Sequence, residues 1–162
     1  LQIGDAVGLA GPYGEAFLRS DHKGPVLAVA GGTGIVPIQS IVTTALANGM
    51  DQPLHLYWGA RTAADLYAEP SFHALAERYR NLKYVGVVAD GTAEGHSGGN
   101  VSDAVAAAFR DLRGFKAYVA GPPAMVGATK RALLSRGLAE ADIHTDPFLP
   151  GDHHSPNVMA AQ

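Results

Sequence analysis

Three short segments of this sequence carry residue types suited to holding a phosphate-bearing ligand. The first, Gly31–Pro37, contains three glycines followed by a proline. Glycines let a backbone turn sharply and approach a bulky anion, and the helix start that follows offers free N–H groups and a positive dipole end. Pro37 fits the first helical turn, where its missing N–H costs nothing. Because a Gly-x-Gly pattern alone is weak, a glycine-rich turn without a ligand explains this segment equally well.

The other two segments lie further along the chain. Gly121 allows close backbone approach, and the following Pro122 and Pro123 fix the entry to a helix. Taken alone, this segment is also explained as a plain helix start. Arg61 supplies a cation that could meet a ribose phosphate or a pyrophosphate, or it is a solvated surface arginine. No Lys-Ser/Thr pair follows the first glycines, which excludes a nucleoside triphosphate P-loop.

A regular alternation of apolar patterns predicts the elements that position these segments. Five apolar runs predict strands, and apolar residues at helical spacing between them predict four helices. The fold class expected is α/β, with a five-stranded doubly wound parallel sheet. The predicted strands are residues 26–30, 54–58, 84–89, 116–120 and 143–145. The predicted inner helix faces carry Ile38, Ile41, Val42, Ala45 and Leu46, then Phe72, Leu75, Ala76 and Tyr79, then Val101, Val105 and Phe109.

The predicted sheet fixes where a ligand should bind. Open α/β sheets bind ligands beyond the carboxyl ends of their strands, at the point where strand order reverses. The loops after Ala30 and Ala120 are expected to cap neighbouring strands there, with further loops after Trp58 and Ala89. Two glycine-lined helix starts side by side would form a cleft for an extended ligand. Asp90–Gly99 is predicted to be a loop, with Asn100 or Ser102 capping the next helix.

Composition excludes several other function classes. The 162 residues include no cysteine, so this chain cannot hold a disulfide, a cysteine nucleophile or a cysteine-bound iron–sulfur cluster. The net charge is −3 and no run of Lys or Arg is present, so the sequence has no basic surface of the kind that binds nucleic acid. No apolar stretch is long enough to span a membrane. Seven scattered histidines lack the spacing of metal ligands, so no metal site is predicted. A cytoplasmic location is expected.

Four ordered motifs resemble the ferredoxin–NADP reductase superfamily. They are Gly11–Gly14, Gly31–Pro37, Tyr57–Thr62 and Ala120–Pro123. Within that superfamily the chain resembles the NAD(P)H-binding domain of aromatic-ring dioxygenase reductases, and Asp146–Pro150 extends the likeness. The resemblance implies a flavin-binding antiparallel β-barrel before this domain. On this basis residues 1–19 are expected to be the end of that barrel, already in strand form at Leu1–Leu9, with residues 24–150 the NAD(P)H-binding domain and residues 151–162 a loose tail.

The resemblance also implies roles for single residues. Gly31, Gly32, Thr33, Gly34 and Pro37 would border the pyrophosphate and the nicotinamide end of the nucleotide. Gly121, Pro122 and Pro123 would contact the nicotinamide ribose, and Arg61 the adenosine half. Phe148 would lie near the flavin ring, so that Thr33 and Phe148 line the site of hydride transfer. No side chain is expected to act as an acid or base, because the cofactors carry this reaction.

The implied activity is hydride transfer from NADH or NADPH to FAD, which the missing upstream domain would hold. Single electrons would then pass to a ferredoxin or an oxygenase iron–sulfur partner. Alternatives are a free-flavin reductase, the reductase module of a flavohaemoglobin, and, in another class, a non-catalytic nucleotide-binding or interaction module. NADH is favoured over NADPH, since no second cation accompanies Arg61 and Asp65 would oppose a phosphate.

Overall fold

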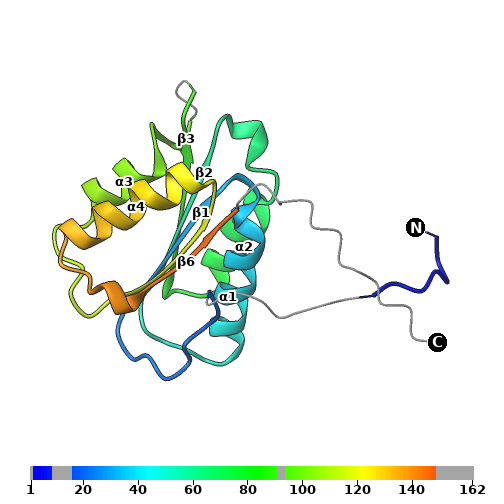
Figure 1. Cartoon of the computed structure of the whole chain (residues 1–162), viewed down its shortest axis with the longest axis horizontal. Helices are drawn as coiled ribbons and strands as arrows, with labels where there is room; N and C mark the ends of the chain where they lie inside the picture. Colours follow the sequence, from blue (N-terminus) through cyan, green and yellow to red (C-terminus); the bar gives the residue numbers. More distant parts are fainter. Residues whose placement is uncertain (1, 9–15, 91–93, 149–162) are drawn as a thin grey trace, which may run out of the picture.

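The computed structural model describes residues 2–8, 16–90 and 94–148. Within these ranges, six strands form one sheet in the order β4-β3-β2-β1-β5-β6, and every neighbouring pair is parallel (Figure 1). The strands are β1 (Val26–Gly31), β2 (Leu54–Ala60), β3 (Leu82–Val88), β4 (Ser97–Gly98), β5 (Lys116–Gly121) and β6 (Ile143–Pro147). The α-helices are α1 (Ile35–Ala47), α2 (Glu69–Arg78), α3 (Val101–Ala108) and α4 (Pro123–Ser135), and short 3₁₀ turns cover Gly32–Gly34, Ala63–Asp65 and Glu140–Asp142.

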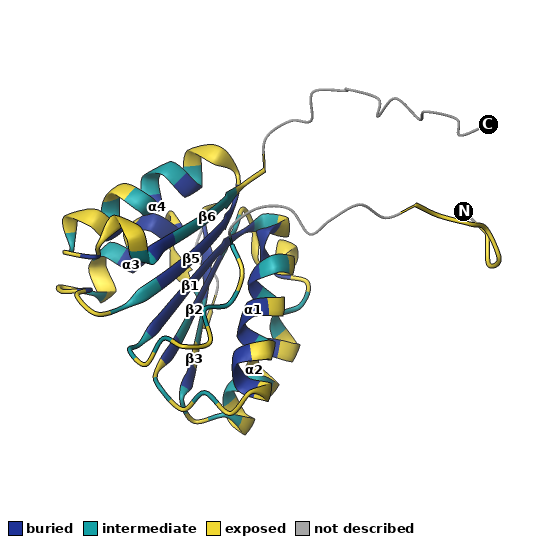
Figure 2. Cartoon of the chain, turned by 60° about the horizontal axis from the view of Figure 1, so that its bottom comes forward, coloured by how far each residue is buried: buried dark blue, intermediate teal, exposed yellow. Residues whose placement is uncertain are grey.

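The sheet lies between two pairs of helices, which confirms the doubly wound arrangement. Helices α1 and α2 pack on one face and α3 and α4 on the other (Figure 2). The central strand β1 is buried at all six positions because its alternate side chains enter two different cores. Two neighbouring aromatic residues of β2 follow the same division, with Trp58 in the α1–α2 core and Tyr57 in the α3–α4 core. None of the helices in the described ranges combines the length and apolar character of a membrane span.

Strand order reverses at β1, and this determines where the loops meet. The chain runs outward from β1 through β2, β3 and β4, then crosses to the other side of β1 to form β5 and β6. Ala30 of β1 lies opposite Ala120 of β5 and Trp58 of β2. The loops that follow these strands therefore emerge side by side, as the sequence predicts.

Three local expectations need correction. The sheet has a sixth strand, β4, which pairs with Val87 and Val88 inside the segment expected to be a loop. Residues 2–8 contain a turn and no strand, because no neighbouring strand supplies them with a ladder of hydrogen bonds. Asn100 occupies the N-cap position of α3 but makes no capping bond, since its side-chain amide donates to the Asp103 carboxylate at 3.2 Å. The expected turn at residues 11–14 and the tail at 151–162 lie outside the described residues.

Candidate functional site

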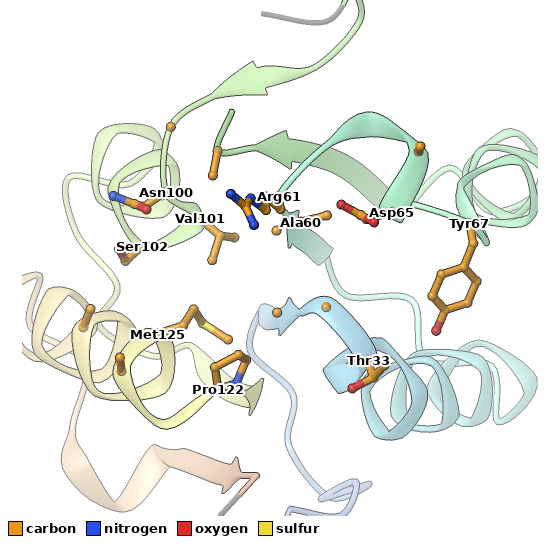
Figure 3. A pocket seen from close by; sticks show the side chains of 18 residues that line it. Thr33, Ala60, Arg61, Asp65, Tyr67, Asn100, Val101, Ser102, Pro122 and Met125 are labelled. Carbon is orange, nitrogen blue, oxygen red and sulfur yellow. The ribbon is translucent and has the colours of Figure 1, made fainter. Parts of the chain in front are cut away.

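A pocket of about 860 Å³ opens at the carboxyl edge of the sheet (Figure 3). It lies where β1, β2, β3 and β5 end, so strand ends form one face, and the others are formed by the turns, loops and helix starts that follow these strands. The lining residues are Gly31, Gly32, Thr33, Gly59, Ala60, Arg61, Ala64, Asp65, Tyr67, Ala89, Gly99, Asn100, Val101, Ser102, Pro122, Ala124, Met125 and Ala128. Its volume falls within the roughly 300–1,000 Å³ range of small-molecule and cofactor sites.

The glycines of the first loop perform different tasks. A Cβ added to Gly34 would lie 2.2 Å from the carbonyl oxygen of Ala120, so this glycine lets the start of α1 pack against β5. A Cβ added to Gly32 would meet nothing within 4 Å, but its φ of +53° is one that other residues rarely adopt. The buried Trp58 indole Nε1 donates a hydrogen bond to the Gly32 carbonyl at 2.9 Å, and this bond holds the turn against the core. Gly32 thus leaves open space on the side of the loop that faces the pocket.

The second loop lies against the first. Gly121 has a φ of +142°, and a Cβ there would lie 2.8 Å from the Gly31 carbonyl oxygen, so only glycine fits between the two strand ends. Pro122 and Pro123 then start α4 without N–H groups of their own, and the Val126 N–H bonds the Pro122 carbonyl at 3.0 Å. The first N–H groups of a helix have no intrahelical acceptor, which leaves those of Ala124 and Met125 available at the pocket wall. The second loop therefore offers backbone donors and a positive helix end.

Arg61 is the one lysine or arginine among the described residues that line the pocket. Its Nε donates to the Asp90 carboxylate at 2.8 Å, and this bond and the charge of Asp90 raise the pKa of the guanidinium. Asp65 lines the pocket nearby, where its carboxylate accepts hydrogen bonds from Thr62 Oγ1 and Thr62 N at 2.8 and 2.9 Å. These bonds lower the pKa of Asp65 and keep it charged.

The pocket includes residues that the sequence does not indicate as ligand-binding. Tyr67 stands at one end, 62% exposed, with its ring edge-on to Trp58 at 5.3 Å. Asn100, Val101 and Ser102, at the start of α3, form the opposite wall (Figure 3). Gly59 permits this arrangement, because a Cβ on it would lie 2.8 Å from Val101 Cβ. The sequence predicts that a ligand binds near the loop after Ala89, but it does not predict that Tyr67, Asn100, Val101 and Ser102 line the pocket.

The structure brings most of the predicted site residues to this edge. Lining positions are held by Gly31, Gly32, Thr33, Arg61 and Pro122. Outside the lining, Gly34, Pro37, Gly121 and Pro123 shape the two loops and helix starts. Phe148 follows β6, and its N–H donates to the Gly121 carbonyl at 2.9 Å. Its side chain is 38% exposed and does not enter the core. In the described ranges, no three histidine or acidic side chains gather as metal ligands.

Comparison with known proteins decides the family. The sequence model described as "Oxidoreductase NAD-binding domain" matches residues 28–131, nearly all of the sheet and helices that form the pocket. The chain belongs to this NAD-binding domain family. The match confirms the resemblance that the sequence motifs indicate.

Relatives of this NAD-binding domain are reductases. The chain is 45% identical over 151 residues to the ferredoxin–NAD(P)(+) reductase component of naphthalene 1,2-dioxygenase/salicylate 5-hydroxylase systems from Ralstonia sp., covering 93% of this chain and 46% of that protein. A probable flavin reductase of Photobacterium leiognathi is 38% identical over 139 residues, covering 85% and 59%. The crystal structure of the Amycolatopsis cytochrome P450 reductase GcoB superposes with a TM-score of 0.82 at 35% identity, covering 91% of this chain and 46% of that one. The chain thus spans about half the length of the curated relatives named here.

Proposed function

We propose that this chain is the NAD(P)H-binding half of a flavin-dependent reductase. It would bind a nicotinamide dinucleotide and present the nicotinamide to a flavin held by the neighbouring barrel domain. One observation carries the proposal: the two glycine-bearing loops and two helix starts converge on a single pocket at the point where strand order reverses. The relatives' naming as reductase components supports the same conclusion.

The pocket fits an extended nucleotide along its length. The loop at Gly31–Thr33 would hold the pyrophosphate with its backbone, since Gly32 leaves open space on that side. Pro122 would contact the nicotinamide ribose, and Arg61 would face the adenosine half. Tyr67 offers an exposed aromatic surface at the same end of the pocket as Asp65, suited to a base.

The chain's own contribution to the reaction is positioning. When bound, the nicotinamide and the flavin supply hydride chemistry and the conversion to single electrons. Because hydride transfer between two cofactors needs no acid or base from the protein, the residues that line the pocket would hold the nucleotide and exclude water. The Phe148 N–H bond to Gly121 places this aromatic residue beside the end of β5. An exposed Phe148 there favours a flavin-facing role over the non-catalytic nucleotide-binding or interaction module.

The partner proposed downstream is a ferredoxin or an oxygenase iron–sulfur centre. Support comes from relatives named as reductase components of naphthalene dioxygenase systems and of an aromatic O-demethylase. A free-flavin reductase is the second candidate, favoured by the similarity to the probable flavin reductases. In the protein with its flavin domain, steady-state reduction of added ferredoxin compared with added riboflavin would separate the two. A cytoplasmic location stays a prediction from sequence.

The proposal is tested by following backbone amide shifts by NMR while NADH is added to the chain. The amides of Gly31–Val36, Gly121 and Ala124 should move in a saturable manner at up to millimolar nucleotide. Amides at the opposite edge of the sheet, such as those of Asn48–Gln52, should stay in place. If the loop amides do not respond at millimolar nucleotide, the assignment is wrong.

A further inference from the structure

A histidine–glutamate pair outside the pocket connects two segments that form its walls. His96 Nε2 lies 2.8 Å from Glu69 Oε2, and these side chains are only 13% and 18% exposed. Glu69 begins α2, two residues after Tyr67 at one end of the pocket. His96 precedes β4, three residues before Gly99, which lines the pocket next to the opposite wall. The pair therefore links the position of one wall to that of the other.

Strand β3 leaves room for this pair. A Cβ added to Gly86 would lie 2.8 Å from both Glu69 Oε1 and His96 Cδ2, so any other residue at this position would displace one of the two side chains. Beyond the pair, the Gly99 N–H donates to the Val88 carbonyl at 2.9 Å and holds the chain against β3 as it enters the pocket edge. The contact is thus part of the packed structure and not a chance meeting of surface side chains.

Both ring nitrogens of His96 face hydrogen-bond acceptors. Nε2 faces the Glu69 carboxylate, and Nδ1 lies 2.9 Å from the Glu94 backbone carbonyl oxygen. A neutral imidazole carries one N–H and can donate only one of these two bonds, whereas the imidazolium donates both. The protonated ring therefore ties α2 to the backbone of the segment before β4, and the neutral ring gives up one of the two ties.

Other titratable groups face the pair from the elements packed against it. On α2, His73 Nε2 lies 3.5 Å from Glu69 Oε1, and the His73 side chain is 60% exposed. On β3, burial raises the pKa of Tyr84 and the charge of Glu69 raises it further, so the phenol stays neutral. Glu94 is itself exposed and contributes its backbone carbonyl. Within this cluster, His96 is the mostly buried group of a type whose charge changes near neutral pH.

We propose that His96 is a positioning residue and that its second proton determines how firmly the pocket holds a nucleotide. When the ring is protonated, both bonds hold the segment that leads to Gly99 against α2. When the pH rises and the proton leaves, one bond is lost, the wall loosens and the nucleotide binds more weakly. The inference rests on the proposed nucleotide-binding function and adds to it a controlling group outside the pocket.

The expected effect has the size of one hydrogen bond. We expect the dissociation constant of NADH to rise about threefold to fivefold between about pH 6 and about pH 8.5, a range that includes the ordinary histidine value near 6.5. The test is calorimetric titration of the chain with NADH at intervals over this range. The wild type is compared with His96→Gln, which cannot become charged, and with Glu69→Gln, which keeps the shape of the partner but removes its charge.

Both variants should bind NADH with a shallower dependence on pH than the wild type. His73→Gln is the matched control, because His73 contacts the same carboxylate from its exposed side, and this variant should keep the wild-type profile. Glu69→Gln also provides a second route to the same conclusion should the His96→Gln protein fail to fold, since it alters the pair from α2.

Each outcome has a definite meaning. A wild-type affinity that is independent of pH overturns the inference and leaves the proposed function intact. Parallel profiles for the wild type and His96→Gln also overturn it, because a purely structural role weakens binding by the same factor at every pH. A profile that is flattened by His73→Gln and not by His96→Gln assigns the effect to His73 and overturns the inference. If the wild type binds no NADH at any pH, the proposed function itself is wrong and the inference falls with it.

Discussion

Replacing Gly34 by alanine should show which glycines of the first loop serve packing and which leave room for a ligand. The added Cβ would lie 2.2 Å from the Ala120 carbonyl oxygen and 2.8 Å from the Gly121 nitrogen. Contacts of this kind are essentially never shorter than 3.0 Å, so β5 or the start of α1 must move by the difference between 2.2 and 3.0 Å, about 0.8 Å. Both neighbours are backbone atoms of a central buried strand and cannot rotate away.

The loss in free energy of unfolding expected for Gly34→Ala can be estimated. Overpacking a well-packed interior costs about 1–3 kcal/mol, and a clash with backbone places Gly34→Ala at about 3 kcal/mol. In a domain of this size about 1 kcal/mol lowers Tm by roughly 2–4 °C, so a fall of roughly 6–12 °C is expected. Urea and thermal unfolding followed by circular dichroism measure both quantities.

Gly32→Ala is the matched comparison. Its Cβ would meet nothing within 4 Å, so only the strain of a φ of +53° opposes it, about 1–2 kcal/mol. Because Gly32 lines the pocket, its substitution should weaken NADH binding more than its modest effect on stability suggests. A Gly34→Ala protein within about 0.5 kcal/mol of wild type, or more stable than Gly32→Ala, would refute the packing argument.

Three further predictions follow from buried or pocket-lining side chains. Burial against Phe109 and Phe115, followed by the charge of Lys83, lowers the pKa of His55. The unfolded chain therefore takes up a proton at His55 before the folded chain does. As a result, the free energy of unfolding should fall as the pH drops below about 6.5. Trp58→Phe removes the donor to the Gly32 carbonyl and should cost about 1–3 kcal/mol in urea unfolding while weakening NADH binding. Tyr67→Leu should weaken NADH binding at least fivefold in a calorimetric titration, since stacking on a base contributes about 1–3 kcal/mol, with little change in stability.

Each of these predictions has its own control. For His55, the His55→Gln protein should show a shallower fall in stability between pH 6.5 and 5, and an identical slope would contradict the assignment. For Trp58, the control is Tyr57→Phe, on the opposite face of the same strand, which should leave NADH affinity unchanged. For Tyr67, an unaltered affinity would show that the base binds elsewhere.

The fold could be predicted from sequence because it depends on local patterns. The run from Val26 to Ala30 is apolar at every position, and that is required only of a strand buried on both faces. Ile38, Ile41 and Val42 recur at helical spacing, and all three are buried in the core that α1 shares with the sheet. The strand β4 escaped prediction because a two-residue strand among glycines has no pattern of its own and depends on hydrogen bonds to β3.

The candidate site was predictable only in part. The glycine loop, Arg61 and Pro122 were predictable because glycine, a cation and a helix-opening proline have marked local preferences, and the strand-order rule places them at one edge. Tyr67, Asn100 and Ser102 could not be found in this way. Each belongs to a segment whose position depends on packing between distant elements, such as α3 against Gly59.

The sequence by itself determined the fold class, the place of the two glycine-bearing loops at the carboxyl edge of the sheet, and the absence of cysteine chemistry from this chain. Those features follow from residue type and short-range periodicity, which can be read directly from the sequence. Only the tertiary structure decided that Gly34 serves packing while Gly32 leaves space, and that Arg61 is engaged by Asp90. The reason is that both features depend on segments far apart in the sequence. Packing between such segments sets how close a glycine lies to a neighbouring strand and which partner a charged group meets. Arg61 and Asp90, for example, are 29 residues apart.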